Sequence, residues 1–316
     1  MQPRPFDLSS AKLALVLNAA SGKKDALTTG RKIRDKLSPV VREFLVYPAR
    51  KGSAIVRAAQ QAVKDGADVV IALGGDGTQS AVAGVLAGSD RVMAVLPGGT
   101  FNYFARGLGV GDTLDAALET ILNGQIGTVD IGEVNGRIFL NNASFGIYPE
   151  ILERREAIYD RYGRSRAAAY WSVLLSLLDL RDPMHLALTV NGATRHFYTP
   201  LAFAARSPYQ LEGLGLDGAD AVRAGHFALF LAKGKSPGGL MSAAFRLAMG
   251  RTARGQDFDL VISDDLLIET SHPTRLVAFD GEKARLTGPF HLRMRPGALS
   301  IILPKSKSWA VSGKAA

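Results

Sequence analysis

The sequence contains no cysteine in its 316 residues. This absence excludes disulfide bridges and thiolate metal sites, and it fits a reducing compartment. Histidine is scarce as well: the five histidines are scattered and form no His-x-x-His pair of the kind that holds a transition metal. Any catalytic chemistry is therefore expected to depend on other residue types.

Long apolar runs are also missing. The most apolar stretch, residues 167–180, is too short to span a bilayer. The first residues have neither the basic segment nor the apolar segment of a secretory signal. We therefore expect a cytoplasmic protein.

Positive charge exceeds negative charge, with a formal net charge of +9 at pH 7. This balance favours anionic partners, such as nucleotides, nucleic acids or acidic lipid headgroups, and does not choose among them. Hydrophobic residues make up 47% of the chain and charged residues 21%, so a sizeable core can form. The length exceeds what one compact domain usually needs, and we expect two domains.

The first part of the chain alternates short apolar runs with amphipathic stretches. The apolar runs are rich in β-branched residues and predict strands at 13–18, 41–47 and 69–73. Helical spacing predicts helices at 27–37, 53–64, 78–86 and 113–122. Such alternation indicates an α/β domain with a mostly parallel sheet covered on both faces.

The second part is predicted to be mostly antiparallel β, forming a sandwich-like domain. Asn135-Gly136 and Asn191-Gly192 each separate two alternating apolar segments, which is a strong hairpin signal. Two helical segments, 149–162 and 166–180, interrupt the strands. Further strands are predicted at 197–205, 226–231, 258–262, 266–270, 275–279 and 299–303.

The most specific motif is Gly74-Gly75-Asp76-Gly77-Thr78, which follows a predicted strand and leads into a predicted helix. A glycine-rich turn at this junction lets backbone N–H groups approach a polyphosphate, and the helix N-terminus favours negative charge. Asp76 would then lie beside the phosphates, where it could hold magnesium or orient a nucleophile. The alternative is a plain strand–helix turn.

A second glycine turn, at 97–99, precedes Thr100 and Asn102 where another helix is expected to begin. These two side chains could contact an anion, or they could simply cap the helix. Near the C-terminus, Asp280-Gly281-Glu282 follows an apolar strand. This segment could be an ordinary hairpin turn, or Asp280 could accept a proton from an attacking hydroxyl group, as phosphoryl transfer requires.

With these motifs the sequence resembles the diacylglycerol kinase catalytic-domain family, which includes sphingosine kinases and bacterial soluble lipid kinases. The resemblance runs along nearly the whole chain. Five segments carry it in order: Asn18-Ala19-Ala20-Ser21-Gly22, similar to Asn-Pro-x-Ser-Gly; the glycine loop at 74–78; 97–106, similar to Pro-x-Gly-Thr-x-Asn-x-x-Ala-Arg; 141–146, similar to Asn…Ser-x-Gly; and 280–282, the family's carboxylate turn.

The resemblance implies an α/β nucleotide-binding domain at 1–127, completed by 296–316, and a β-rich lipid-substrate domain at 128–295. It also implies ATP and Mg²⁺ in the cleft between them. By similarity, Asp280 is the base, Glu282 shares its catalytic turn, and Asp76 organises metal or phosphate; some relatives give the base role to the aspartate at the position of Asp76. The implied nucleotide-binding residues are Asn18, Ser21, Gly22, Gly74, Gly75, Asp76, Gly77, Thr78, Gly99, Thr100 and Asn102.

The chain departs from the family pattern after the glycine loop, where Ser80 and Ala81 replace an amide and a carboxylate. Arg223-Ala224-Gly225 stands where the family's bacterial members have the Asp-Asp-Gly of a structural magnesium site, and the loss of both carboxylates argues against that site. These losses motivate one alternative, a catalytically weak lipid- or nucleotide-binding protein. Another alternative is an NAD kinase, which shares the glycine loop, but the chain lacks the expected Asn-Glu pair and the Asn-Thr-Asp-Gly stretch.

The apolar segment 166–180 could line a channel for an acyl chain or simply pack in the core. Arginines precede it, and a basic flank of this kind would suit an anionic membrane surface or a solvated helix face. We therefore expect a lipid kinase that acts on a diacylglycerol, a sphingoid base or a related lipid, with peripheral membrane contact and no nucleic-acid partner. A homodimer is left open.

Overall fold

The structure is a computed structural model, and the chain forms two compact units. The first unit contains Met1–Ile131, Arg137–Leu140 and Arg295–Ala316, and the second contains Gly132–Gly136 and Asn141–Met294. The structure describes residues 4–5, 7–19, 26–50, 52–149, 152, 183–233, 239, 242 and 257–305.

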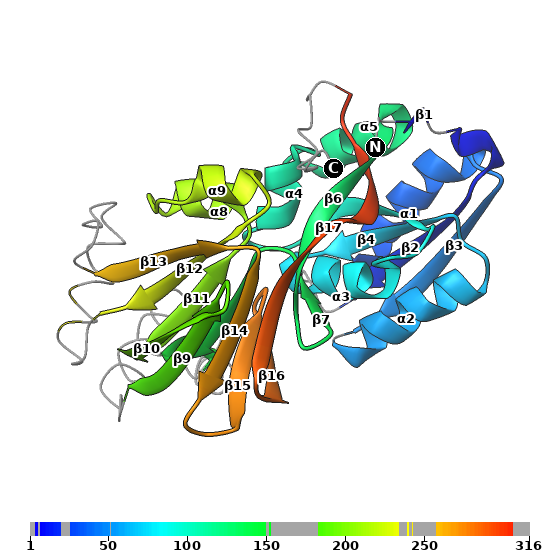
Figure 1. Cartoon of the computed structure of the whole chain (residues 1–316). Helices are drawn as coiled ribbons and strands as arrows, with labels where there is room; N and C mark the ends of the chain where they lie inside the picture. The colour runs from blue at the N-terminus through cyan, green and yellow to red at the C-terminus, as the bar shows by residue number, and fades with distance from the viewer. Residues whose placement is uncertain are drawn as a thin grey trace. The chain divides into compact units, whose positions relative to one another are not determined.

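A parallel sheet forms the centre of the first unit (Figure 1). Its strand order is β3-β2-β4-β5-β17, and each neighbouring pair is parallel. The part of β17 that pairs with β5 here is Ser300–Ile301. The strands are β2 (Lys12–Asn18), β3 (Glu43–Ala49), β4 (Val69–Gly74), β5 (Val92–Pro97) and β17 (Phe290–Leu303).

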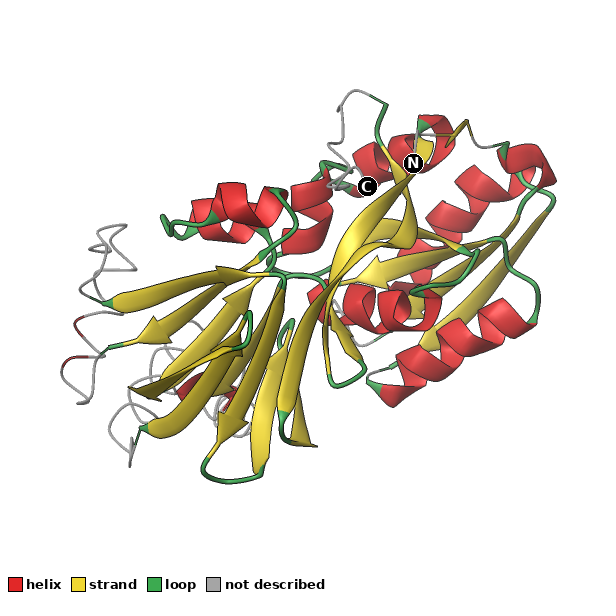
Figure 2. Ribbon diagram, viewed as in Figure 1, coloured by secondary structure: helices red, strands yellow, loops and turns green. Residues whose placement is uncertain are grey.

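Helices cover both faces of this sheet, as Figure 2 shows. On one face, Leu13 and Leu15 of β2 pack with Ile33 and Leu118 from two helices; on the other face, Val16 packs with residues of three more helices. Burial on both sides explains why every residue within β4 is buried and why its sequence is a continuous apolar run. The helices are α1 (Ala26–Leu37), α5 (Leu114–Asn123), α2 (Ser53–Lys64), α3 (Asp76–Leu86) and α4 (Tyr103–Leu108).

Short elements complete the first unit and lead into the second. A turn at Asn135-Gly136 joins β6 to β7, and both turn residues have positive φ, +46° and +80°, as a tight hairpin turn requires. The remaining elements are β1 (Arg4–Pro5), the 3₁₀ helices η1 (Leu8–Ser10) and η2 (Ser38–Val40), β6 (Gln125–Val134) and β7 (Arg137–Phe139).

Two antiparallel sheets form the second unit. One has the strand order β13-β12-β11-β8-β15-β16, and the other contains β10-β9-β14 and the first part of β17. Phe145 of the first sheet contacts Phe290 of the second edge to face, with 5.1 Å between ring centroids. The strands are β8 (Asn142–Gly146), β9 (Met184–Val190), β10 (Ala193–Thr199), β11 (Leu201–Ala205), β12 (Phe227–Ala232), β13 (Phe258–Ser263), β14 (Asp265–Thr270), β15 (Thr274–Phe279) and β16 (Glu282–Thr287).

Two short helices, α8 (Pro208–Gly213) and α9 (Ala219–Arg223), cover part of the six-stranded sheet (Figure 1). Leu211 of α8 and Val222 of α9 are buried against Ala205 and Phe230. Ser207 begins α8, because its side chain accepts a hydrogen bond from the N–H of Gln210. This small core fixes α8 beside β11.

The predicted fold class is confirmed: an α/β unit with a parallel sheet precedes a unit of antiparallel strands. One predicted strand, 197–205, is wrong as a single element. It divides at Pro200 into β10 and β11, which belong to different sheets, because proline has no N–H group to continue the ladder. The predicted helices at 149–162 and 166–180 lie outside the described residues, apart from Pro149 and Leu152.

Candidate functional site

Two glycine turns leave the parallel sheet at the same edge. Gly74-Gly75 follows β4 and Gly98-Gly99 follows β5, and these strands are adjacent and parallel, with Gly74 opposite Pro97. The N–H of Gly98 donates to the C=O of Gly74 at 3.0 Å. In open α/β sheets, ligands bind outside this carboxyl edge. The two turns therefore lie where the fold favours a site.

The turns are in direct backbone contact because neither carries side chains there. A Cβ atom added to Gly98 would lie 3.1 Å from the Cα of Gly74. A Cβ atom added to Gly74 would lie 2.5 Å from the hydroxyl oxygen of Thr78. These glycines are required for the turns to pack, and their absent side chains leave backbone groups at the surface of this edge.

Helix α3 begins in the first turn. The C=O of Gly75 accepts the N–H groups of Thr78 and Gln79, at 2.9 and 3.1 Å, so the helix is regular from its first turn. The first N–H groups of any α-helix have no partner inside the helix, and they favour an anion. The N-terminus of α3, which includes Asp76 and Gly77, can therefore bind phosphate oxygens.

Asn18 joins this edge from the end of β2. Its Nδ2 donates to the Oγ1 of Thr78 at 2.9 Å, and Thr78 is buried. The hydroxyl group of Thr78 thus links the end of β2 to the start of α3. The backbone N–H of Thr78 donates to the C=O of Gly75. The predicted site residues Ser21 and Gly22 lie outside the described residues.

Asp76 connects the two turns. Its Oδ1 accepts the backbone N–H of Phe104 at 3.1 Å, so it caps the N-terminus of α4. The side chain is partly buried at the first position of α3. A carboxylate at this position can also face a metal ion or phosphate, but its first structural role is to hold α4 against the glycine loop.

Asn102 has a role that the sequence did not predict. It occupies the N-cap position of α4, but its side chain makes no capping bond. Instead its Oδ1 accepts the N–H of Gly99 and its Nδ2 donates to the C=O of Gly99, both at 2.9 Å. With φ of +51°, Asn102 closes the second turn on itself. The side chain that caps α4 is therefore that of Asp76, and not that of Asn102, as the sequence suggested.

The loop between Gly99 and Asn102 exposes two side chains. Thr100 is exposed, as its predicted contact with phosphate requires. Phe101 is 56% exposed and stacks on Tyr103, with 5.4 Å between ring centroids. Because Asn102 fixes the turn, Phe101 is held at the surface.

Gln79, the residue before Ser80, belongs to this edge of the sheet, although no sequence motif indicated it. It is fully buried, and its Nε2 donates to the C=O of Gly74 at 3.0 Å. This bond lies directly beneath the first glycine turn. A polar residue one turn into α3 could have indicated a structural hydrogen bond, but the sequence does not show that its partner is the C=O of Gly74.

Asp280 lies in the second unit, at the turn between β15 and β16. Asp280 and Gly281 have φ of +48° and +90°, so the predicted hairpin turn is present. The carboxylate nevertheless turns inward: Asp280 is 8% exposed, and its Oδ1 accepts the N–H groups of Asn141 and Asn142 at 2.7 and 3.1 Å. The turn therefore supplies both a hairpin and a fixed, buried carboxylate.

Glu282 is placed differently from Asp280, although the two residues share one turn. It is exposed and begins β16, paired with Phe279 across the hairpin. Its side chain takes no part in the bonds that hold Asp280. The catalytic role expected for Glu282 stays a prediction.

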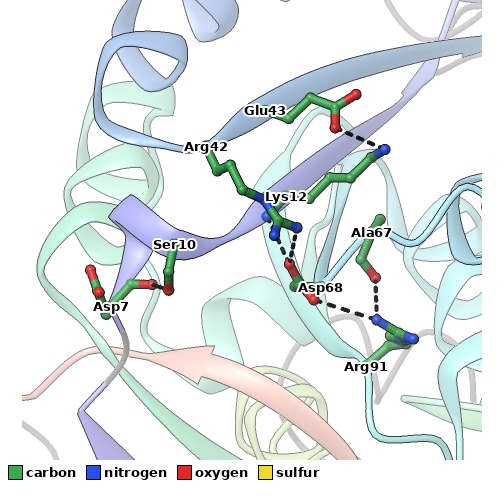
Figure 3. Close-up of polar contacts among 8 residues, drawn as sticks. All are labelled: Asp7, Ser10, Lys12, Arg42, Glu43, Ala67, Asp68 and Arg91. Carbon is green, nitrogen blue, oxygen red and sulfur yellow. Dashed lines mark hydrogen bonds and ion pairs between the residues drawn. The ribbon is translucent and has the colours of Figure 1, made fainter.

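A cavity of about 350 Å³ lies at the opposite edge of the parallel sheet, where the strands begin. There Asp68 lies between Arg42 and Arg91, at 3.4 and 3.5 Å (Figure 3), and it accepts the N–H of Lys12 at 2.8 Å. Arg91 also pairs with Asp90. Because the carboxylates balance both arginines, this cavity lacks the excess positive charge that a polyphosphate site needs.

Comparisons with known proteins give the same family for the part of the chain that contains the glycine turns. Residues 12–134 match the family model of the diacylglycerol kinase catalytic domain. A diacylglycerol kinase from Bacillus subtilis is 38% identical over 136 residues, which are 39% of this chain and 45% of the relative. One from Staphylococcus aureus is 33% identical over 134 residues, which are 42% of each chain.

The matched region thus spans less than half the length of these relatives. The fold extends further: a crystal structure of a diacylglycerol kinase from Bacillus anthracis covers 94% of this chain and 98% of its own, with a TM-score of 0.68 and 21% sequence identity. The family model and the two relatives confirm the resemblance to the diacylglycerol kinase catalytic-domain family for about the first 130 residues, and the solved structure shows the shared fold of the remainder.

Proposed function

We propose that this chain, which carries the motifs of the diacylglycerol kinase catalytic-domain family, is an ATP-dependent lipid kinase. It transfers the γ-phosphate of ATP to a hydroxyl group of a diacylglycerol, a sphingoid base or a related lipid. The observation that carries the proposal is the pair of glycine turns at the carboxyl edge of β4 and β5, packed together by backbone contacts.

In this proposal the N-terminus of α3 binds the phosphates. The backbone of Gly75, Asp76 and Gly77 presents N–H groups, and the exposed Thr100 adds a hydroxyl group. Asn102 keeps the second turn in one conformation, so the binding groups are ordered before the nucleotide arrives. Such preorganisation lowers the entropy cost of binding.

The carboxylate of Asp76 fits a magnesium ion. Mg²⁺ in kinases is held by one or two carboxylates, water and substrate phosphates, so one carboxylate at the start of α3 is sufficient. When bound, the ion supplies neutralisation of charge on the phosphates. The hydrogen bond from the N–H of Phe104 holds the carboxylate of Asp76 in position.

Asp280 acts as the base and accepts the proton of the lipid hydroxyl group. Two backbone N–H groups hold one of its oxygens, which fixes the direction of the carboxylate. A carboxylate that orients the nucleophile is the main protein group that phosphoryl transfer needs besides charge stabilisation. Asp76 is the alternative base, and Glu282 is a further carboxylate on the turn of Asp280.

The test is transfer of labelled γ-phosphate from ATP, with magnesium, to a total lipid extract, followed by identification of the labelled product. Parallel reactions contain diacylglycerol, sphingosine or NAD⁺ as the acceptor. A labelled lipid is the expected result. A labelled dinucleotide would instead establish an NAD kinase, and tight binding of ATP or lipid without any product would indicate a binding protein on this scaffold.

A lipid acceptor resides in a membrane, so peripheral membrane contact is part of the proposal. None of the helices in the described part of the chain is long and apolar enough to cross a membrane. The net charge of +9 favours anionic vesicles. Cosedimentation with anionic but not neutral vesicles, weakened by salt, is the expected result.

A further inference from the structure

The hydrogen bonds that hold Asp280 continue to helix α8. The peptide group between Asn141 and Asn142 donates its N–H to the Oδ1 of Asp280 at 3.1 Å. The C=O of the same peptide group accepts the N–H groups of Arg206 and Ser207, at 2.7 and 3.2 Å. A peptide group that both donates and accepts in this way is fixed in orientation, and its bonds polarise one another.

A side chain adds a second connection between the same two segments. The Nδ2 of Asn142 donates to the Oε1 of Gln210 at 3.1 Å, and both residues are buried. Gln210 is itself fixed, because its backbone N–H donates to the Oγ of Ser207 at 3.2 Å. The start of α8 therefore contacts the Asn141–Asn142 segment through the main chain and through one buried side chain.

The bond from Arg206 continues the pairing of β8 with β11, but the side-chain connection is not needed to build the sheet. Strand β8 is already paired on both sides, with β11 and β15. Apolar side chains at both 142 and 210 would fill the same volume without buried polar groups, and such a double replacement is often neutral or stabilising. The amide pair is therefore better explained by what it orients than by stability.

We propose that Gln210 is a positioning residue, which orients the Asn141–Asn142 peptide group and, through it, the carboxylate of Asp280. The inference rests on the proposed function, in which Asp280 accepts the proton of the lipid hydroxyl group. Gln210 does not touch the reacting atoms. It sets the direction of the N–H group that Asp280 accepts.

The variant pair Gln210→Met and Gln210→Glu tests this role. Met keeps the volume and removes the acceptor for Asn142, whereas Glu keeps an acceptor oxygen. We expect Gln210→Met to lower kcat by about five- to tenfold, the effect of one net hydrogen bond, with the lipid KM nearly unchanged. Gln210→Glu keeps an acceptor oxygen for Asn142 and should restore kcat.

Hydrogen exchange gives a readout that needs no substrate. In Gln210→Met the amide of Asn142 should exchange about tenfold faster, while the other amides of β8 stay unchanged. Glu212→Gln is the matched control: Glu212 is exposed on the same helix and pairs with Arg223, so its loss should change neither kcat nor exchange at Asn142.

Equal kcat and equal exchange in Gln210→Met would overturn the inference. So would uniform loss of protection across β8, because that result would show a purely structural role. If the wild-type protein transfers phosphate to no lipid, the proposed function fails, and exchange at Asn142 then decides alone whether Gln210 orients this peptide group. Full activity of Asp280→Asn would instead remove the base assignment.

Discussion

A Cβ atom on Gly99 would lie only 2.5 Å from the Cα of Gly75, so the two glycine turns touch through their backbones. Real Cβ atoms do not approach backbone this closely, and no side-chain rotation can relieve the contact. The distance between the two turns is therefore set by the absence of side chains on both. Any side chain at Gly99 must push the turns apart.

Gly99→Ala is expected to lower the free energy of unfolding by about 1–3 kcal/mol, because it overpacks a close backbone contact. It should also weaken ATP binding. Gly84→Ala is the control: Gly84 lies inside α3, where the nearest atom to a new Cβ is 3.9 Å away. Gly84→Ala should raise the free energy of unfolding by about 0.5–1 kcal/mol, because alanine stabilises a helix interior relative to glycine. Denaturant unfolding measures the stability of both variants. Unchanged stability of Gly99→Ala would contradict the close backbone contact of the two turns.

Asp76 has a structural and a proposed catalytic role, and two variants separate them. Asp76→Asn keeps an oxygen for the N–H of Phe104, whereas Asp76→Ala removes it. Relative to Asp76→Asn, the alanine variant should lose about 1 kcal/mol of stability, the usual cost of a lost helix cap. Both should lose activity by a factor on the order of 100 or more.

The magnesium dependence of Asp76→Asn is a further check. If the carboxylate helps to hold the ion, half-maximal activity requires more Mg²⁺ than in the wild type. A variant with normal turnover and normal magnesium dependence would leave Asp76 with only its structural role.

Asp280→Asn should lower kcat by roughly 10²–10⁴, because the amide cannot accept the proton. The fold should be retained, since the Asn oxygen can still accept the N–H groups of Asn141 and Asn142. Glu269→Gln, on β14 of the same unit, is the matched control, and its exposed side chain predicts a small effect. Turnover and thermal unfolding are measured together; near-normal turnover in Asp280→Asn would refute its role as base.

Tyr47 and Asp65 form a pair whose titration can be followed directly. The Tyr47 hydroxyl group donates to the Oδ2 of Asp65 at 2.6 Å. Desolvation, and then the bond to Asp65, raise the pKa of Tyr47 to about 12. The same bond is the largest cause of the lowered pKa of Asp65, to which Gln61 also contributes. We expect one tyrosine to ionise near pH 12 by absorbance, and Tyr47→Phe to remove that step.

The two pKa shifts make the stability of the fold depend on pH. The raised pKa of Tyr47 stabilises the fold below its unfolded value of about 10, and this contribution is lost as the pH rises through about 12. The lowered pKa of Asp65 stabilises the fold above about 3.9 and is lost as the pH falls through its folded value. The stability difference between wild type and Tyr47→Phe should therefore be greatest between these limits. A difference that does not depend on pH would contradict the pairing.

The sequence alone determined the local elements and their chemistry. Periodicity and turn residues predicted the strand and helix on either side of Gly74–Thr78, the boundaries of α2, and the hairpin turns at Asn135, Asn191 and Asp280. These features depend on residues close together in the chain, where side-chain period and backbone preference act directly.

Only the tertiary structure decided which of these segments meet. Gly75 touches Gly99 because β4 and β5 are neighbours, and the carboxylate of Asp280 reaches Asn141 because β15 pairs with β8. The contact of Gln210 with Asn142 likewise depends on how α8 packs beside β11. Strand order and register follow from the packing of whole sheets, which no local pattern specifies.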